Sequence, residues 1–485
     1  MKLRVPMPRM FTAYGTRFMP FADAASPELP MARLLRLSLF QVVIGMVTAL
    51  LVGTLNRVMI VELHVPAWWV ALAVAIPMVF APLRTLIGYR SDTHPSALGL
   101  RRIPYMWTGT LLLFGGLSIM PFALLLLSEP ESANLWVGQL GACLAFVLVG
   151  TGIQVTQTAG MALANDLASD DKRPRVVALL YSMLLVGMIV SSAVFGLVLA
   201  DFTPQKLIQL VQGCAVMVAV MNLAALWKQE ARGAKRGQRE AGGFAHSWRE
   251  LMAQPQMRRF LWTLALGTLA FNMQDIVLEP YAAEILKLDV GATSALTALS
   301  AGGALLAFVL SARWLSGGMH ACRLASMGVL LGLPAFAMVI FSGPLEAVWL
   351  FRTGVGLIGF SGGLFSVGML VTAMGMAQSS SPLGHLGGLV IGTWGAVQAT
   401  SAGAAMALGG ALRDSVSVLA MSGALGEVLV SPITAYSFVY HLEMYLLFVV
   451  LVALGPMLHA NRLAARAKAQ KTTPPQPFGL AQLPS

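Results

Sequence analysis

Twelve apolar runs, each long enough to cross a lipid bilayer, constrain the fold of this chain more than any other feature. A membrane-spanning helix needs about 20 apolar residues, and only helices or closed barrels satisfy their backbone hydrogen bonds in lipid. The composition agrees, with 57% hydrophobic and 11% charged residues. The sequence therefore predicts an all-α polytopic membrane protein. The runs cover roughly 37–60, 66–88, 104–127, 135–160, 176–200, 205–227, 259–280, 292–312, 323–342, 347–372, 387–411 and 437–459.

Basic residues are distributed unevenly between the loops. If both termini lie in the cytoplasm, 26 of the 32 Lys and Arg residues fall on that side, as the positive-inside rule requires. The net charge of +11 is thus explained by membrane topology, and nucleic acid is not expected as a partner. We expect both termini to be cytoplasmic.

The runs fall into two blocks of six, joined by a basic loop. This pattern predicts five segments: a cytoplasmic arm (1–36), a six-helix bundle (37–227), a basic cytoplasmic linker (228–258), a second six-helix bundle (259–459) and a cytoplasmic, disordered tail (460–485). The end of the arm, 31–36, is expected to lie along the lipid headgroups.

Two acids, Asp275 and Glu279, lie inside the seventh run. Their spacing places them on one helix face about one turn apart, and an uncompensated charge at the bilayer centre costs at least about 2.5–3.5 kcal/mol. Counted along the helix, both acids lie in the half away from the linker, and Pro280 is expected to end the helix.

Three further charged residues, Arg57, Glu62 and Arg352, are expected at the same depth as the two acids. We predict one charge cluster from all five residues, with Arg57 and Asp275 as the first pairing. The cluster is either a static brace or part of a gate or ligand groove.

The loop after the second run contains Gly88-Tyr-Arg-Ser-Asp92 and then Gly99-Leu-Arg101-Arg102. This resembles the loop signature of the major facilitator superfamily, G-x-x-x-D-x-x-G-R-[RK], with four extra residues before the second glycine and one after it. Glycine permits close helix approach, and the Asp and Arg side chains can form a charge latch between helix ends. The resemblance implies the superfamily fold of two six-helix bundles.

Four longer strings resemble the LhaA/PucC family, also called the bacteriochlorophyll delivery family. They are Gly53-Thr-Leu-Asn-Arg-Val-Met-Ile-Val-Glu-Leu63, Arg84-Thr-Leu-Ile-Gly-Tyr-Arg-Ser-Asp-Thr-His94, Met273-Gln-Asp-Ile-Val-Leu-Glu-Pro-Tyr281 and Gly392-Thr-Trp-Gly-Ala-Val-Gln-Ala-Thr400. The resemblance implies an assembly factor for light-harvesting antenna complexes in the inner (intracytoplasmic) membrane of purple bacteria. The implied cargo is bacteriochlorophyll, with carotenoid as a second pigment. The implied partners are antenna polypeptides, pigment-synthesis machinery and membrane lipid.

Chlorin magnesium takes a fifth ligand, often imidazole and sometimes an amide or water. This makes His441, His64, Gln274 and Asn56 candidate pigment contacts, and no other metal site is expected. Trp394 and Gln398 add a ring face and an amide on the eleventh run. Each also has an ordinary alternative, as an interfacial hydrogen-bonding residue or as helix packing.

Two other functions stay open. A proton-coupled small-solute transporter of the same superfamily would favour acids in the cavity-lining helices, but the fourth and tenth runs contain none. A pigment-biosynthetic enzyme would need a nucleophile and base, a metal cluster or a phosphate loop, and the sequence shows none of these. No catalytic residue is therefore predicted.

Overall fold

The computed structural model describes residues 29–79, 100, 102–127, 135–168, 173–230, 244–377 and 386–472. Within these ranges every element is a helix, and eleven helices are long and apolar enough to cross a membrane. A shorter apolar helix begins the second predicted span at Ala67, and the end of that span lies outside the described residues. The all-α, polytopic fold is confirmed.

The first half of the chain contains α2 (Met31–Thr48), which continues as the π-helical turns η2 (Ala49–Leu55) and η3 (Val58–Glu62), then α3 (Ala67–Val79), α5 (Ile103–Leu127), α6 (Leu135–Leu167), α7 (Arg173–Val198) and α8 (Pro204–Leu226). The second half contains α9 (Phe244–Ala253), α10 (Pro255–Asn272), α11 (Gln274–Glu284), α12 (Val290–Ser316), α13 (Ala321–Ser342), α14 (Val348–Met376), α15 (Gly387–Met421), η5 (Glu427–Leu429) and α16 (Pro432–Thr472).

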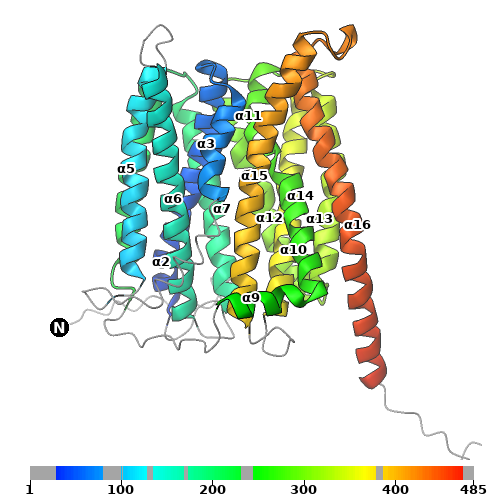
Figure 1. Ribbon diagram of the computed structural model, residues 1–485. Coiled ribbons are helices and arrows are strands. Elements are labelled where there is room, and N and C mark those ends of the chain that lie inside the picture. Colours follow the sequence, from blue (N-terminus) through cyan, green and yellow to red (C-terminus); the bar gives the residue numbers. More distant parts are fainter. Residues whose placement is uncertain are drawn as a thin grey trace, which may run out of the picture.

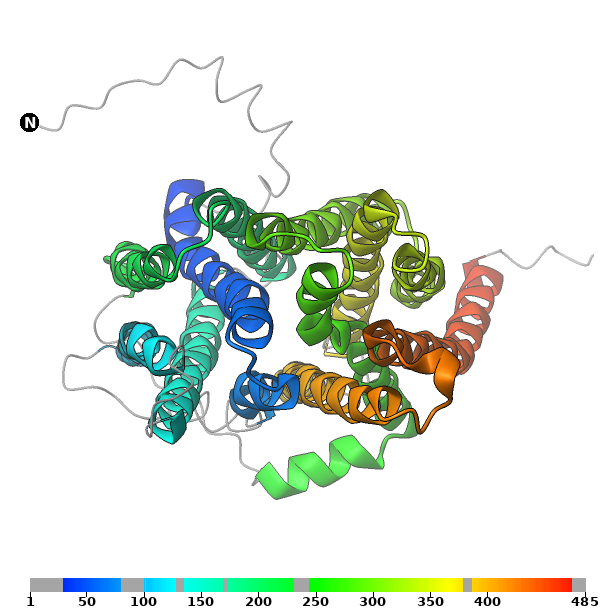
Figure 2. The same cartoon turned by 90° about the horizontal axis from the view of Figure 1, so that it is seen from above.

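The helices run roughly parallel to one another, and α9 lies across one end of them (Figure 1). We call this the α9 end and the opposite end the α11 end. Viewed from above, α2–α8 and α10–α16 form two groups side by side (Figure 2). The groups meet along two helix pairs, α7 with α12 and α3 with α15.

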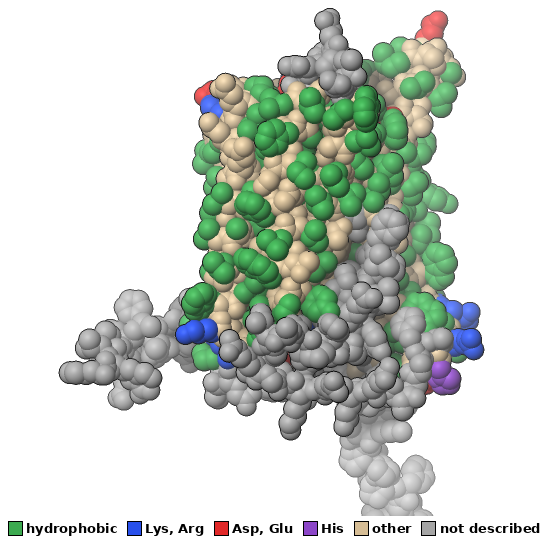
Figure 3. Space-filling view, turned by 60° about the vertical axis from the view of Figure 1, so that its left-hand side comes forward, with side chains coloured by type: hydrophobic (Ala, Val, Ile, Leu, Met, Phe, Trp, Pro, Cys, Tyr) green, Lys and Arg blue, Asp and Glu red, His purple; other side chains and the backbone are tan. Residues whose placement is uncertain are grey.

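Hydrophobic side chains cover the outer face between the two ends (Figure 3). Leu197, Val452 and Trp262 are between 70% and 79% exposed. Such exposure would be costly in water, but it costs nothing against lipid tails, which are as apolar as leucine. The outer face therefore fits a hydrocarbon environment.

Close helix crossings depend on glycine. On α5, a Cβ atom added at Gly109 would lie 2.8 Å from the Thr156 backbone nitrogen of α6, and one added at Gly152 would lie 2.8 Å from the Gly109 carbonyl oxygen. Small residues allow this approach, and van der Waals packing then holds the helices together in lipid. On α14, Gly359 and Gly363 serve the same purpose against α12.

Three boundaries differ from the sequence-based expectation. The first helix begins at Met31, so 31–36 extends α2 instead of forming a separate interfacial segment. Pro280 lies inside α11 and does not end it. Helix α16 continues to Thr472 and projects beyond the bundle (Figure 1), so the first part of the expected tail is helical. The other expected arm and tail residues lie outside the described residues.

The α5–α6 crossing gives a test of this packing. Gly109→Leu should lower the thermal unfolding midpoint of the detergent-purified protein, because overpacking costs about 1–3 kcal/mol. The matched control is Gly115→Leu on the same helix, where an added Cβ meets nothing within 4 Å. Equal midpoints for the two variants would contradict the assigned helix contact.

Candidate functional site

The seventh predicted span is broken into α10 and α11 at Met273. The first N–H of α11, at Gln274, donates to Glu443 Oε1 of α16 over 2.6 Å. Asn56 Nδ2 donates to the Ile276 carbonyl oxygen over 2.9 Å. That carbonyl is free for a side chain because Pro280, four residues later, has no N–H to donate to it. Two side chains from other helices thus complete the hydrogen bonding of α11.

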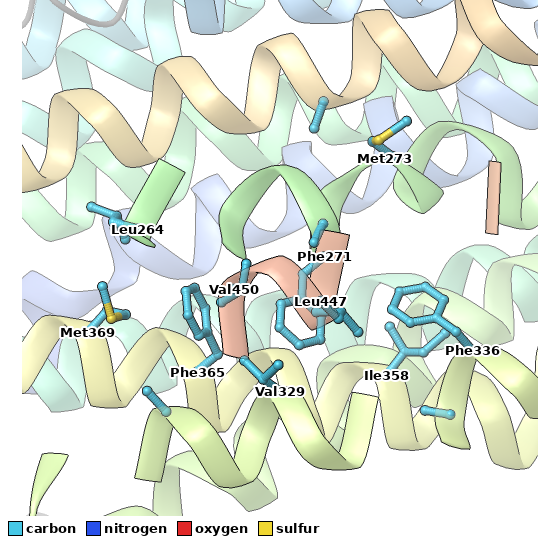
Figure 4. Packing of buried hydrophobic residues seen from close by; sticks show 14 of the residues in the cluster. Leu264, Phe271, Met273, Val329, Phe336, Ile358, Phe365, Met369, Leu447 and Val450 are labelled. Atoms are coloured by element: carbon cyan, nitrogen blue, oxygen red, sulfur yellow. The ribbon is translucent and has the colours of Figure 1, made fainter. Parts of the chain in front are cut away.

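An aromatic and aliphatic cluster holds the chain on the α10 side of the break. The Phe271 ring lies 5.7 Å from the Phe365 ring and 6.3 Å from the Phe336 ring, between centroids. Leu447 and Val450 of α16 approach the same rings (Figure 4). This packing fixes the end of α10, so the break has one defined geometry.

A cavity of about 330 Å³ opens beside the break. Its walls come from α7, α10, α11, α12, α14 and α15, so both helix groups contribute. Most of the lining is apolar, and its polar side chains include Gln274, Asp275, Trp394 and Gln398. The structure therefore brings four predicted residues from two distant segments together.

Two of these polar side chains each contain a buried atom without a hydrogen-bond partner among the described residues. Gln274 and Trp394 are 4% and 5% exposed, and neither Gln274 Oε1 nor Trp394 Nε1 has a partner. Buried polar atoms are nearly always paired. The unpaired acceptor and the unpaired donor thus belong to two residues that line one cavity.

The predicted charge cluster is only partly assembled. Arg57 is 4% exposed; its Nη1 lies 2.7 Å from Glu62 Oε1, and its Nη2 donates to the Leu288 carbonyl oxygen over 3.5 Å. It also interacts electrostatically with Glu279. The expected pairing of Arg57 with Asp275 is wrong, because the nearer Glu62 takes the ion pair. 

The remaining two members of the predicted cluster face different surroundings. Glu279 accepts a hydrogen bond from Thr297 of α12 and lies against Gly53, where an added Cβ would meet its Oε1 at 2.7 Å. Arg352 is exposed on α14 and forms no ion pair with these acids in the part of the chain described. It is not a member of the cluster.

A second network, which the sequence-based interpretation did not anticipate, lies at the α11 end. Arg413 bonds to Glu284 over 2.8 Å and to Asp414 over 2.8 Å, and it stacks over the Tyr436 ring at 5.0 Å. Asp414 also accepts the backbone N–H of Trp68 over 2.8 Å. Because Trp68 lies on α3, this network links the two helix groups.

Other polar contacts join the groups at the same end. Thr54 Oγ1 lies 3.3 Å from Ser294 Oγ, and the Asn56 and Arg57 bonds described above also cross between the groups. Gly196 and Gly291 bring α7 and α12 into backbone contact. The α11 end is therefore closed by contacts between α2–α8 and α10–α16.

The remaining pigment-contact candidates lie away from the cavity. His441 is exposed and its Nδ1 bonds to the Ser437 carbonyl oxygen over 2.7 Å. His64 is exposed and has a φ of 52°. The Asn56 side-chain amide already donates to the Ile276 carbonyl oxygen. No histidine lines the cavity among the described residues. A ligand in this cavity would therefore meet amides and a carboxylate, not imidazole.

The predicted loop latch lies mostly outside the described residues: Gly88, Asp92, Gly99 and Arg101 cannot be placed. Arg102 is described, is 5% exposed, and its Nε lies 3.1 Å from Asp166 Oδ2 of α6. Glu230 accepts the backbone N–H groups of Arg102 and Ile103.

The sequence-based interpretation missed Glu443, which is fully buried. The signal was present, because this acid lies within the twelfth apolar run, as Asp275 and Glu279 lie within the seventh. Tyr436, Tyr440 and Leu447 are also fully buried, and with Glu443 they share one helix face at spacings of three and four residues. That face includes Glu443 and leaves His441 outside.

Comparison with known proteins adds a family. Residues 54–462 match the family described as PUCC protein. Protein PucC of Rhodovulum sulfidophilum is 51% identical over 412 residues, covering 83% of this chain and 90% of the relative. Protein PucC of Rhodobacter capsulatus is 46% identical over 454 residues, covering 92% of this chain and 96% of the relative.

Among solved structures, a mutant of the nucleoside transporter NupG aligns with a TM-score of 0.63 at 15% identity, covering 88% of this chain and 99% of that one. The structural likeness shows the major facilitator fold.

The bond from Asn56 to Ile276 predicts a non-additive pair of variants. Asn56→Ala should destabilise the protein by about 1–3 kcal/mol, because it leaves a buried carbonyl unpaired. Pro280→Ala restores an N–H that can bond to Ile276 within the helix, so Asn56→Ala should cost clearly less in that background. Thermal unfolding of the four proteins forms a double-mutant cycle, and additive costs would contradict the assigned role of Pro280.

Proposed function

Because the chain belongs to the PucC family, which links it to the assembly of photosynthetic antennas, we propose that it binds bacteriochlorophyll in the membrane and delivers it to light-harvesting antenna polypeptides. The observation that supports this most directly is the cavity between the two helix groups, with its apolar walls and with two lining residues, Gln274 and Trp394, that each have one unpaired polar atom. Carotenoid is a second candidate pigment, because apolar walls also suit a polyene.

The donor set of the cavity fits part of a bacteriochlorophyll molecule. An amide oxygen can accept a hydrogen bond from a polar group of the ligand, and Gln274 Oε1 is buried and unpaired. Trp394 Nε1 could donate to a carbonyl group at the edge of the ring. Ligand cavities commonly measure about 300–1,000 Å³, so 330 Å³ holds a portion of the pigment and leaves its long tail outside. We therefore place one edge of the ring here, with the tail in lipid.

The membrane position follows from charge. Lys and Arg are concentrated in the arm, the linker and the tail, and the helix that follows the linker, α10, begins at the α9 end (Figure 1). We place that end and both termini in the cytoplasm, and the chain in the bacterial inner (intracytoplasmic) membrane. Antenna polypeptides would meet it within this membrane, with pigment-synthesis machinery as a further partner.

Reporter fusions test this orientation. Green fluorescent protein joined to the C-terminus should fluoresce, and alkaline phosphatase at the same position should be inactive, because each reporter works on only one side of the inner membrane. Active phosphatase and dark fluorescent protein would reverse the assignment.

A proton-coupled small-solute transporter is the second candidate, and one observation favours it. Glu443 supplies a buried acid in a helix that borders the cavity region, and such acids can carry protons in transporters. Solute-dependent proton flux in vesicles containing a pigment-free preparation would support this candidate against pigment delivery.

Pigment co-purification tests the proposed function. Protein purified in detergent from a host that makes bacteriochlorophyll should show a near-infrared absorption band in fixed ratio to protein. Gln274→Leu should lower the bound pigment about tenfold if the amide contributes about 1.4 kcal/mol, and Trp394→Phe, which removes only the indole N–H donor, should lower it less.

The matched control is His441→Leu, because this histidine is exposed and lies outside the cavity. Its pigment content should equal that of the wild type. A colourless wild-type preparation would contradict pigment binding, and a loss in His441→Leu with none in Gln274→Leu would move the pigment site out of the cavity.

A further inference from the structure

Glu443 is a carboxyl group buried inside the membrane without a cation. Its side chain is fully buried; Oε1 accepts the Gln274 N–H, and Oε2 has no hydrogen-bond partner. No Lys, Arg or His pairs with it in the part of the chain that the structure describes. A lone buried charge is costly and is usually avoided by neutralisation, and one backbone N–H is a small compensation for a full negative charge.

The surrounding titratable groups do not supply a positive charge. Asp275 lies near enough to interact electrostatically with Glu443, as does Tyr440 from the preceding turn of α16. Tyr440 in turn interacts with Tyr281 of α11 and Tyr436 of α16. Asp275 opposes a negative charge on Glu443, and the Tyr440 hydroxyl, which has no hydrogen-bond partner, does not donate to it.

The nearby arginines are engaged elsewhere. Arg57, beside η3, is paired with Glu62 and faces Glu279. Arg413 of α15 is bound to Glu284 and Asp414. Helices α10, α12, α13 and α14 contribute no charged side chain that interacts with Glu443 among the described residues.

Asp275 connects this buried acid with the cavity. It lines the cavity, whereas Glu443 does not, and the two flank Gln274: the Gln274 backbone N–H donates to Glu443, and its side-chain Nε2 donates to Asp275 Oδ1. Two adjacent carboxyl groups cannot easily both be charged. Filling the cavity with an apolar ligand would also remove water from Asp275.

We propose that Glu443 is a proton-binding site, that Asp275 connects it with the cavity, and that an apolar ligand enters the cavity together with one proton. Glu443 holds one proton before the ligand binds; a second proton comes from bulk water and binds a carboxylate oxygen of Asp275, so both carboxyl groups are neutral when the ligand is bound. The linkage to a ligand rests on the proposed function, whereas the proton site on Glu443 stands without it.

The proton site is tested first in the full-length, detergent-purified protein without ligand. Its infrared spectrum at neutral pH should contain the C=O stretch of a protonated carboxyl group, and Glu443→Gln should remove that band. Glutamine keeps the oxygen that accepts the Gln274 N–H, so the variant should fold. Glu284→Gln is the control, because Glu284 forms an ion pair with Arg413, and the band should persist in it. A band unchanged in Glu443→Gln would overturn the site.

The coupling is tested by titrating the wild type with bacteriochlorophyll a in weakly buffered detergent containing a pH indicator. One proton should be taken up for each pigment bound, and the affinity should fall about tenfold for each unit rise in pH while Asp275 is ionised before binding. Asp275→Asn should abolish both the proton uptake and the pH dependence.

The outcomes separate the two claims. Absence of pigment binding would contradict the proposed function and the coupling, and would leave the infrared result on Glu443 standing. Pigment binding without proton uptake would overturn the coupling alone. An affinity that depends on sodium concentration at constant pH would replace the coupled proton with a metal cation and overturn the coupling.

Discussion

Two hydrogen bonds that complete the backbone of α11 hold the centre of this protein together. In lipid, every backbone polar group has to be bonded within the protein, and this span departs from the regular helix twice. The Gln274 N–H, at the break, goes to Glu443, and the Ile276 carbonyl, exposed by Pro280, goes to Asn56. The first bond fixes α11 to its own helix group, and the second fixes it to the other group. The closed α11 end, the cavity and the positions of the buried acids all depend on them.

The same two bonds explain why acids one turn apart have different surroundings. Asp275 follows the break directly and faces the cavity, whereas Glu279 is packed against Gly53 and Thr297. Glycine at position 53 leaves room for the Glu279 carboxyl group, since an added Cβ would lie 2.7 Å from Glu279 Oε1. One acid is thus available to a ligand, and the other belongs to the contact that closes the α11 end.

The fold could be predicted from the sequence because apolar run length and charge placement are local properties. The site could be predicted only in part. Asp275, Gln274, Trp394 and Gln398 were found because polar groups in apolar runs are costly wherever they lie. The partner of Arg57 was not found, because ion pairing depends on the rotation and depth of each helix. Glu62, five residues along the chain from Arg57, was nearer to it than any acid on α11. His441 was chosen for its chemistry, although its helix position left it outside the buried face that contains Glu443.

The cavity walls differ in how they can accept a flat ligand. Two glycines of α14 lie in close contact with α12, since Cβ atoms added at Gly359 and Gly363 would meet the α12 backbone. On α15, Gly392 and Gly395 have nothing within 4 Å of an added Cβ, and they flank Trp394, whose indole N–H is unpaired. Inside the cavity, however, α15 presents the side chains of Trp394 and Gln398 and not these glycines. A planar ligand there would meet the indole and the amide, and it could not approach the α14 backbone at Gly359 or Gly363 without separating α14 from α12.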